Sequence, residues 1–151
     1  MQEIGSDFWK AELKYSDKRF LLSGRTALEY IIRDILVNKK MHSVLMPAYC
    51  CHTMLEPFLR HGIEIRFYDV FYDGNGLCIK MPQIKKQEIV FVMRYFGYCH
   101  IRGLNLEELK KSENIIIEDR THSWLSQTED FSDYSFISYR KWTGIGSIAL
   151  A

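Results

Sequence analysis

The sequence predicts one α/β domain over residues 1–151, in which a mostly parallel β-sheet is flanked by helices. Short apolar runs with strand character alternate with segments of helical periodicity along most of the chain. Several of these runs are continuously apolar, as expected for parallel strands that are buried on both faces. The length of 151 residues is also that of one domain with a substantial core. We therefore expect helices on both faces of a single sheet.

The most regular helix is expected over residues 27–36, with Ser23 as its N-cap. Its apolar residues recur at helical spacing: Ala27, Leu28, Ile31, Ile32, Ile35 and Leu36. A second helix is expected over residues 51–61, where Pro57 requires a kink or a later start. A third, short helix is expected over residues 104–111.

Seven strands are expected between and after these helices, over residues 43–46, 63–68, 77–79, 89–93, 115–117, 134–138 and 147–150. The last run is apolar and the sequence stops directly after it, at Ala151. A chain end normally becomes polar. We therefore expect this chain to be a truncated or fragmentary form of a longer protein.

The composition excludes several classes of protein. Apolar residues make up 47% of the chain, charged residues make up 26% and the net charge is +1, which is typical of a globular protein. Basic residues are balanced by acidic ones, so no nucleic-acid partner is expected. No apolar run reaches the roughly 20 residues that cross a bilayer, and the first residues lack signal-peptide order. We expect a cytoplasmic protein with no membrane partner, whose four cysteines are free thiols.

Two strands end in ionisable residues that the interior of a strand could not hold without partners. Asp119 follows an isoleucine run, and Lys141 follows the strand over residues 134–138. In open α/β sheets ligands bind beyond the carboxyl ends of the strands, so both residues are candidates for chemistry. An acid and an amine suit a cofactor that carries a basic ring nitrogen and an aldehyde. The alternative is two core strands whose loops happen to be charged.

The sequence around these strand ends offers further candidates. Arg25 and Thr26 begin the first helix, where backbone N–H groups suit a phosphate, although Ser23 can serve as a cap alone. His122 can donate to a ligand oxygen or stack on a ring, or be purely structural. Trp142 and an adjacent arginine are expected to shield Lys141 partly from water and to favour its neutral, nucleophilic amine. The alternative is a surface lysine whose aliphatic stem lies over Trp142.

A metal site is a weaker possibility. Cysteine and histidine cluster at residues 50–52 and 99–100, but adjacent cysteines rarely both reach one zinc ion. We expect no metal. The sequence also lacks the glycine patterns of a P-loop and of a dinucleotide-binding fold.

Taken in order, six motifs make the chain resemble the N-terminal part of the DegT/DnrJ/EryC1/StrS-type aminotransferases. They are Gly5-Ser6-Asp7-Phe8-Trp9, Ser23-Gly24-Arg25-Thr26-Ala27-Leu28, Pro47-Ala48-Tyr49-Cys50, Tyr95-Phe96-Gly97, Glu118-Asp119-Arg120-Thr121-His122-Ser123 and Ser138-Tyr139-Arg140-Lys141. These enzymes use pyridoxal phosphate (PLP) to aminate keto sugars attached to nucleotides. The resemblance implies part of the large domain of a fold type I, aspartate-aminotransferase-like protein.

The resemblance also implies roles for the flagged residues. Lys141 would attach the cofactor and shuttle a proton, and Asp119 would pair with the pyridinium nitrogen. His122 would lie near the phenolic oxygen. Three residues would hold the phosphate: Arg25, Thr26 and Ser138. The aromatic residue that stacks on the ring would be Tyr49 or His52, and the sequence does not decide between them.

The chain departs from the family in three respects. Relatives usually have small residues where this chain has Arg120 and Thr121, and many have a longer spacing between Ser138 and Lys141. The C-terminal small domain of the relatives is absent from the sequence. The function that the resemblance implies is amination of a keto sugar nucleotide by an amino-acid donor, as in polysaccharide biosynthesis. The complete enzyme would be a homodimer. The alternative is an inactive truncated homologue, either inert or acting through an interaction.

Overall fold

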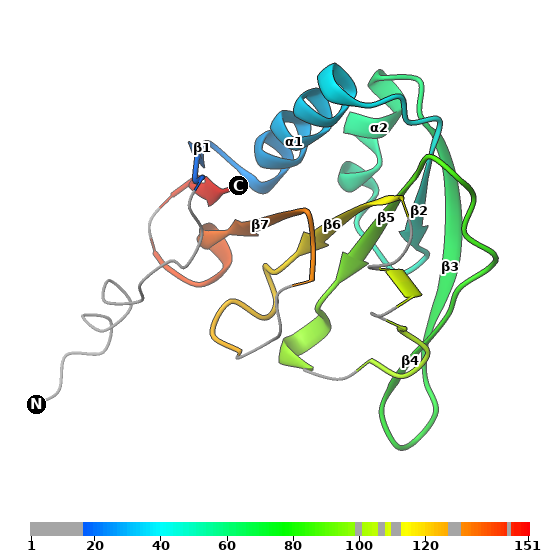
Figure 1. Ribbon diagram of the computed structural model, residues 1–151. Coiled ribbons are helices and arrows are strands. Elements are labelled where there is room, and N and C mark those ends of the chain that lie inside the picture. Colours follow the sequence, from blue (N-terminus) through cyan, green and yellow to red (C-terminus); the bar gives the residue numbers. More distant parts are fainter. Residues whose placement is uncertain (1–16, 99–100, 106–107, 110–112, 127–130, 145) are drawn as a thin grey trace, which may run out of the picture.

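A computed structural model describes residues 17–98, 101–105, 108–109, 113–126, 131–144 and 146–151. These residues form one eight-stranded sheet with the strand order β1-β8-β7-β6-β5-β2-β3-β4 (Figure 1). The strands are β1 (Phe20–Leu21), β2 (Ser43–Pro47), β3 (Glu64–Tyr72), β4 (Leu77–Lys80), β5 (Glu88–Met93), β6 (Ile115–Asp119), β7 (Tyr134–Ser138) and β8 (Ala149–Leu150). The helices are α1 (Gly24–Asn38) and α2 (Glu56–Arg60), with single 3₁₀ turns η2 (His52–Met54), η3 (Tyr95–Gly97) and η4 (Tyr139–Lys141).

The centre of the sheet is parallel and its two margins are antiparallel. β2 pairs in parallel with β3 and β5, and the parallel pairing continues through β6 to β7. β4 and β8 run antiparallel to their neighbours. The carboxyl ends of β2, β5, β6 and β7 therefore meet at one edge of the sheet, the place where ligands bind in open α/β folds.

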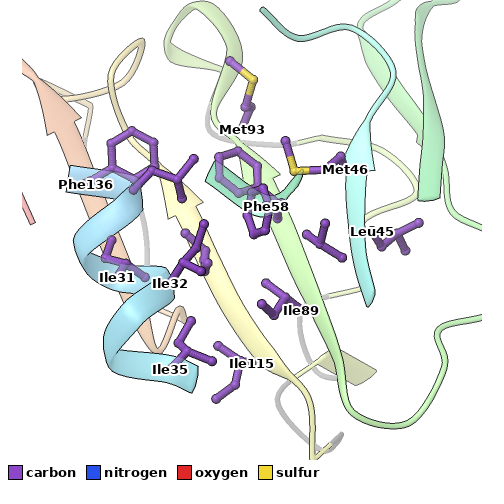
Figure 2. Packing of buried hydrophobic residues seen from close by; sticks show 14 of the residues in the cluster. Ile31, Ile32, Ile35, Leu45, Met46, Phe58, Ile89, Met93, Ile115 and Phe136 are labelled. Carbon is purple, nitrogen blue, oxygen red and sulfur yellow. The ribbon is translucent and has the colours of Figure 1, made fainter. Parts of the chain in front are cut away.

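Both described helices cover the same face of the sheet (Figure 1). Figure 2 shows isoleucines of α1 and Phe58 of α2 packed on side chains of β5 and β6. The ring of Phe58 contacts that of Phe91 edge-on, with a centroid distance of 6.3 Å. Because side chains alternate along a strand, Phe91 faces this core while its neighbours Val90 and Val92 face the other way.

Leu109 and Phe131 are among the described residues that cover the second face of the sheet. Val90, Val92 and Ile116 pack there on Leu109 and Phe131. The predicted helix over residues 104–111 falls partly outside the described residues. Within this segment Glu108 and Leu109 are described and are helical. The predicted fold class, a mostly parallel sheet flanked by helices, is confirmed.

Local chemistry explains how the helices begin. Ser23 caps α1 as predicted, because its Oγ accepts a hydrogen bond of 3.2 Å from the backbone N–H of Thr26. The predicted helix over residues 51–61 is instead the turn η2 followed by α2. Pro57 lies in the first turn of α2, where its missing N–H costs no helical hydrogen bond. The later start is therefore correct.

The strand β1 is not predicted by the sequence pattern. It pairs only with β8 among the described strands, and backbone hydrogen bonds between Arg19 and Ala151 (2.8 and 3.0 Å) extend that pairing. β8 itself lies between β1 and β7. The predicted strand over residues 147–150 is thus real but shorter.

Candidate functional site

The carboxyl edge of the sheet gathers the residues for which the resemblance implies a role in holding the cofactor. Asp119 and Ser138 are the last residues of β6 and β7, and Lys141 ends the turn η4 directly after β7. α1 begins at the same edge, because the position of a Cβ on Gly24 would lie 3.2 Å from Cβ of Ser138. Tyr49 and His52 follow β2.

The carboxylate of Asp119 is buried, with only 6% of the residue exposed. Its Oδ1 accepts a hydrogen bond of 2.8 Å from the backbone N–H of Thr121. Burial raises the pKa of Asp119, while hydrogen bonding from Thr121 and the charges of His122 and Lys141 oppose that rise. The site thus holds a carboxylate that gains from a cationic partner.

The neighbouring carboxylate of Glu118 serves a different purpose. Strand alternation turns it toward the opposite face, where its Oε1 accepts a hydrogen bond of 2.6 Å from Nε of the buried Arg94. A buried ion pair of this kind is already compensated. Of the two adjacent acids, Asp119 is therefore the one that faces the candidate site.

His122 lies three residues beyond Asp119 and stacks on Phe96. The two rings are nearly parallel, with an interplanar angle of 17° and a centroid distance of 5.3 Å. The Nδ1 atom of His122 is buried and has no hydrogen-bond partner among the described residues. Burial lowers the pKa of His122 and the Lys141 charge lowers it further, whereas Asp119 raises it.

Phe96 is a site residue that the sequence analysis quoted only within a motif and gave no role. It has a left-handed backbone with φ of 50°, which is uncommon for a residue with a side chain, and it is followed by Gly97 with φ of 79°. Such conformations concentrate at functional sites. The run Tyr95-Phe96-Gly97 directly after a buried strand is the signal that could have identified it.

Lys141 is exposed at the mouth of the site. The expectation that Trp142 and an adjacent arginine shield it from water is wrong, because Lys141 is exposed. The indole Nε1 of Trp142 donates to the backbone carbonyl of Thr121. Hydrogen bonds with Thr53 lower the pKa of the Cys51 thiol, and the charges of Lys141 and Arg25 lower it further. Lys141 and Arg25 therefore both lie within electrostatic reach of Cys51, although the three residues belong to different parts of the chain.

The start of α1 offers backbone N–H groups rather than free side chains. Nη1 of Arg25 lies 3.1 Å from Oε2 of Glu56, and Oγ1 of Thr26 lies 2.9 Å from Oγ of Ser23. The first N–H groups of a helix have no partner within the helix and attract anions. Because Gly24 has no side chain, the hydroxyl-bearing Ser138 lies directly beside this helix start.

Tyr49 and His52 are both exposed after β2. The ring of Tyr49 lies beside that of Tyr95 at a centroid distance of 5.7 Å, and its carbonyl accepts a hydrogen bond of 2.5 Å from the Tyr95 hydroxyl. Burial raises the pKa of Tyr95, so this hydroxyl stays a donor. The choice between Tyr49 and His52 as a stacking residue remains open.

In the described part of the chain, no group of three or more histidine, cysteine or acidic side chains is arranged to hold a metal ion. Cys99 and His100 lie outside the described residues. Within the same residues no helix has the length and apolar character that crossing a bilayer requires.

Comparisons with known proteins identify the class of fold. No protein-family profile matches the sequence, and no curated protein matches it. Solved structures do match: the chain has an aspartate-aminotransferase-like fold and corresponds to part of such proteins. It spans about 40% of the length of the structures that it matches.

Three of these structures define the similarity. Spr1654 from Streptococcus pneumoniae, assigned as a sugar aminotransferase and solved in its PLP form, matches with a TM-score of 0.63 and 14% identity, over 88% of this chain and 40% of its own. GDP-4-keto-6-deoxymannose-3-dehydratase (ColD), solved as an H188N mutant with bound GDP-perosamine, matches with a TM-score of 0.63 and 18% identity, over 88% and 38%. N-succinyldiaminopimelate aminotransferase from Mycobacterium tuberculosis matches with a TM-score of 0.60 and 13% identity, over 89% and 41%. These similarities establish the fold.

The residues at the carboxyl edge can be compared with the groups of PLP, in whose presence Spr1654 was solved. PLP presents a phosphate, a ring nitrogen that carries a proton, a phenolic oxygen and an aldehyde. The edge presents a helix start beside Ser138, the buried carboxylate of Asp119, the exposed amine of Lys141 and the buried Nδ1 of His122, which has no hydrogen-bond partner in the described part of the chain. Each group of the cofactor thus has a chemically matched candidate.

Proposed function

We propose that this chain binds PLP at the carboxyl edge of its sheet and forms part of an aminotransferase that acts on a keto sugar nucleotide. The observation that carries the proposal is the buried carboxylate of Asp119, which interacts electrostatically with His122 and Lys141. A buried acid is costly unless a cation faces it. A protonated ring nitrogen would supply that cation.

The residues of the carboxyl edge would hold the cofactor in the following way. Asp119 would keep the ring nitrogen protonated, and His122 would lie beside the phenolic oxygen. The N–H groups at the start of α1, with Ser138 and the residues Arg25 and Thr26, would hold the phosphate. Tyr49 or His52 would stack on the ring. The partners would be a keto sugar nucleotide, an amino-acid donor and a second copy of the complete chain.

Lys141 would do the chemistry. Its exposed Nζ would hold the aldehyde carbon of the cofactor. Once released, it would move a proton between the substrate carbon and the cofactor carbon. PLP, when bound, supplies an electron-accepting ring that stabilises negative charge on the substrate. Because Lys141 lies near Asp119, its ammonium charge also helps to keep that carboxylate ionised before the cofactor enters.

The proposal is tested by adding PLP to the purified chain and following the absorbance of the bound cofactor. Borohydride reduction followed by mass spectrometry then locates the modified residue. We expect the label on Lys141, and Lys141→Met is expected to abolish both the absorbance band and the label. Lys39→Met removes an exposed lysine at the far end of α1 and is the matched control, because PLP also reacts with surface amines.

The outcome separates binding from chance labelling. A band that saturates with PLP, survives Lys39→Met and disappears in Lys141→Met supports the proposal. Labels that are spread over many lysines, with no saturable band, would overturn it and would leave the inactive homologue as the better description.

A further inference from the structure

Thr121 uses three of its polar groups on the residues that flank the candidate site. Its backbone N–H donates to Oδ1 of Asp119 at 2.8 Å, and its Oγ1 accepts from the backbone N–H of Ser138 at 3.1 Å. Its carbonyl accepts from the indole Nε1 of Trp142. Thr121 is itself 97% buried, with only 3% of the residue exposed.

The hydroxyl of Thr121 continues the sheet where the backbone ladder stops. β6 and β7 pair up to Asp119 and Phe136, and the N–H of Arg120 adds one more hydrogen bond, of 3.0 Å, to the carbonyl of Phe136. Beyond this point the chain after β6 turns away. The N–H of Ser138, the next donor on β7, therefore finds the side chain of Thr121 in place of a backbone carbonyl.

Ser138 and Trp142, which both donate hydrogen bonds to Thr121, lie on either side of Lys141 in the sequence. Ser138 precedes the turn η4, Trp142 follows it, and Lys141 is the last residue of the turn. The side chain of Lys141 is exposed, so little packing holds it in place. The position of its backbone therefore depends on the residues at either end of the turn, and both of these bond to Thr121.

We propose that Thr121 is a positioning residue that fixes Lys141 relative to Asp119 by tying the ends of β6 and β7 together. This inference rests on the proposed function, since it concerns the distance between the groups that would hold the aldehyde and the ring nitrogen. It assigns a use to a residue at which the chain departs from the small residues of the family that it resembles. Thr121 need not touch the cofactor.

The test uses variants that remove chosen links of this arrangement. Thr121→Val keeps the shape of the side chain, removes the acceptor for Ser138 and removes the side-chain hydrogen bond that lowers the pKa of Asp119, whereas Thr121→Ser keeps the hydroxyl. Trp142→Phe keeps an aromatic ring and removes the donor to the Thr121 carbonyl. Ser43→Ala is the matched control, because it removes a buried hydroxyl whose 2.9 Å hydrogen bond to Glu88 lies at the opposite edge of the sheet.

The first readout needs no cofactor. The charge of Lys141 lowers the pKa of His122, so the pH titration of the His122 ring, followed by NMR, reports where Lys141 lies. We expect Thr121→Val and Trp142→Phe to raise the pKa of His122, because Lys141 moves away from it. Thr121→Ser and Ser43→Ala should leave the titration unchanged. When Lys141→Met is already present, Thr121→Val should add no further shift.

The second readout is the affinity for PLP, measured from the absorbance of the bound cofactor. Loss of one buried hydrogen bond corresponds to an affinity about tenfold weaker in Thr121→Val, and Thr121→Ser should restore it. An unchanged His122 titration in Thr121→Val would overturn the inference, as would an equal shift in the Lys141→Met background. If the wild-type chain binds no PLP, the proposed function fails, and the His122 titration still decides the role of Thr121.

Discussion

Replacement of Asp119 by asparagine should have opposite effects on the free chain and on the chain with PLP. Asparagine keeps the oxygen that accepts from Thr121 at 2.8 Å and removes the buried charge. Burial raises the pKa of Asp119 above its unfolded value, so the folded state favours the protonated carboxyl group. The resulting contribution to stability is present in full below the unfolded pKa of about 4. That stability is lost as the pH rises through the folded pKa.

The expected magnitude follows from this linkage. Each unit by which the folded pKa exceeds the unfolded value corresponds to about 1.4 kcal/mol lost at alkaline pH. Removing a cost of about 1 kcal/mol raises the melting temperature of a chain of this size by roughly 2–4 °C. Asp119→Asn should therefore melt higher than the wild type at pH 8, and the difference should vanish toward pH 4.

The same substitution should weaken PLP binding. A hydrogen bond between charged groups contributes roughly 1.5–3 kcal/mol, so its loss corresponds to an affinity about 10- to 100-fold weaker. Thermal unfolding between pH 4 and pH 8 and a PLP titration measure the two effects. An apo protein that is less stable at pH 8 after Asp119→Asn would refute the electrostatic reasoning, and unchanged PLP affinity would refute the contact with the ring.

Glu88 provides a contrasting buried carboxylate for this experiment. It is fully buried at the start of β5, and both of its oxygens accept from Nη1 of Arg66, at 2.8 and 2.9 Å. Because breaking a buried pair leaves the other charge behind, Glu88→Gln should destabilise the free chain by about 3 kcal/mol. It should leave PLP affinity unchanged, since the pair lies at the opposite edge of the sheet.

Two further predictions concern the helix start and the histidine. Gly24→Ala should weaken PLP binding about tenfold, because its Cβ would lie 3.2 Å from Cβ of Ser138 and displace it from the phosphate site, whereas Gly76→Ala at the distant turn after β3 should leave the affinity unchanged. A Gly24→Ala variant that binds PLP normally would show that the phosphate lies elsewhere. Burial and the Lys141 charge lower the pKa of His122, so the folded state favours the neutral ring. This contribution to stability is present in full above the unfolded pKa of about 6.5 and is lost as the pH falls through the lowered pKa. His122→Gln should therefore reduce the loss of melting temperature between pH 7 and pH 5, and an unchanged acid slope would contradict this.

The sequence allowed the framework of the site to be predicted because strand ends leave a local signal. An apolar run that stops abruptly at Asp119, and another that stops before Lys141, identified two strands that prove to be neighbours in the sheet. The helical spacing after Ser23 likewise identified α1 and its cap. Each of these signals lies within a few residues of the group it concerns.

Features that depend on distant contacts could not be predicted in the same way. The indole of Trp142 donates a hydrogen bond to Thr121, a residue on another loop. The stacking of Phe96 on His122 joins the ends of β5 and β6. The strand β1 has only two residues, too few to show any periodicity, and it exists because β8 offers an edge.

The position of β8 has a consequence for how this chain reaches its folded state. β1 and β8 come from distant parts of the sequence, and β8 is the only described strand that joins β1 to the rest of the sheet. Pairing between such distant segments is slow, because a long loop must close first. Until residues 149–151 dock, the outer edge of β7 has no partner and is open to pairing with another chain. Aggregation of this chain during synthesis should therefore depend on how soon residues 149–151 become available for pairing.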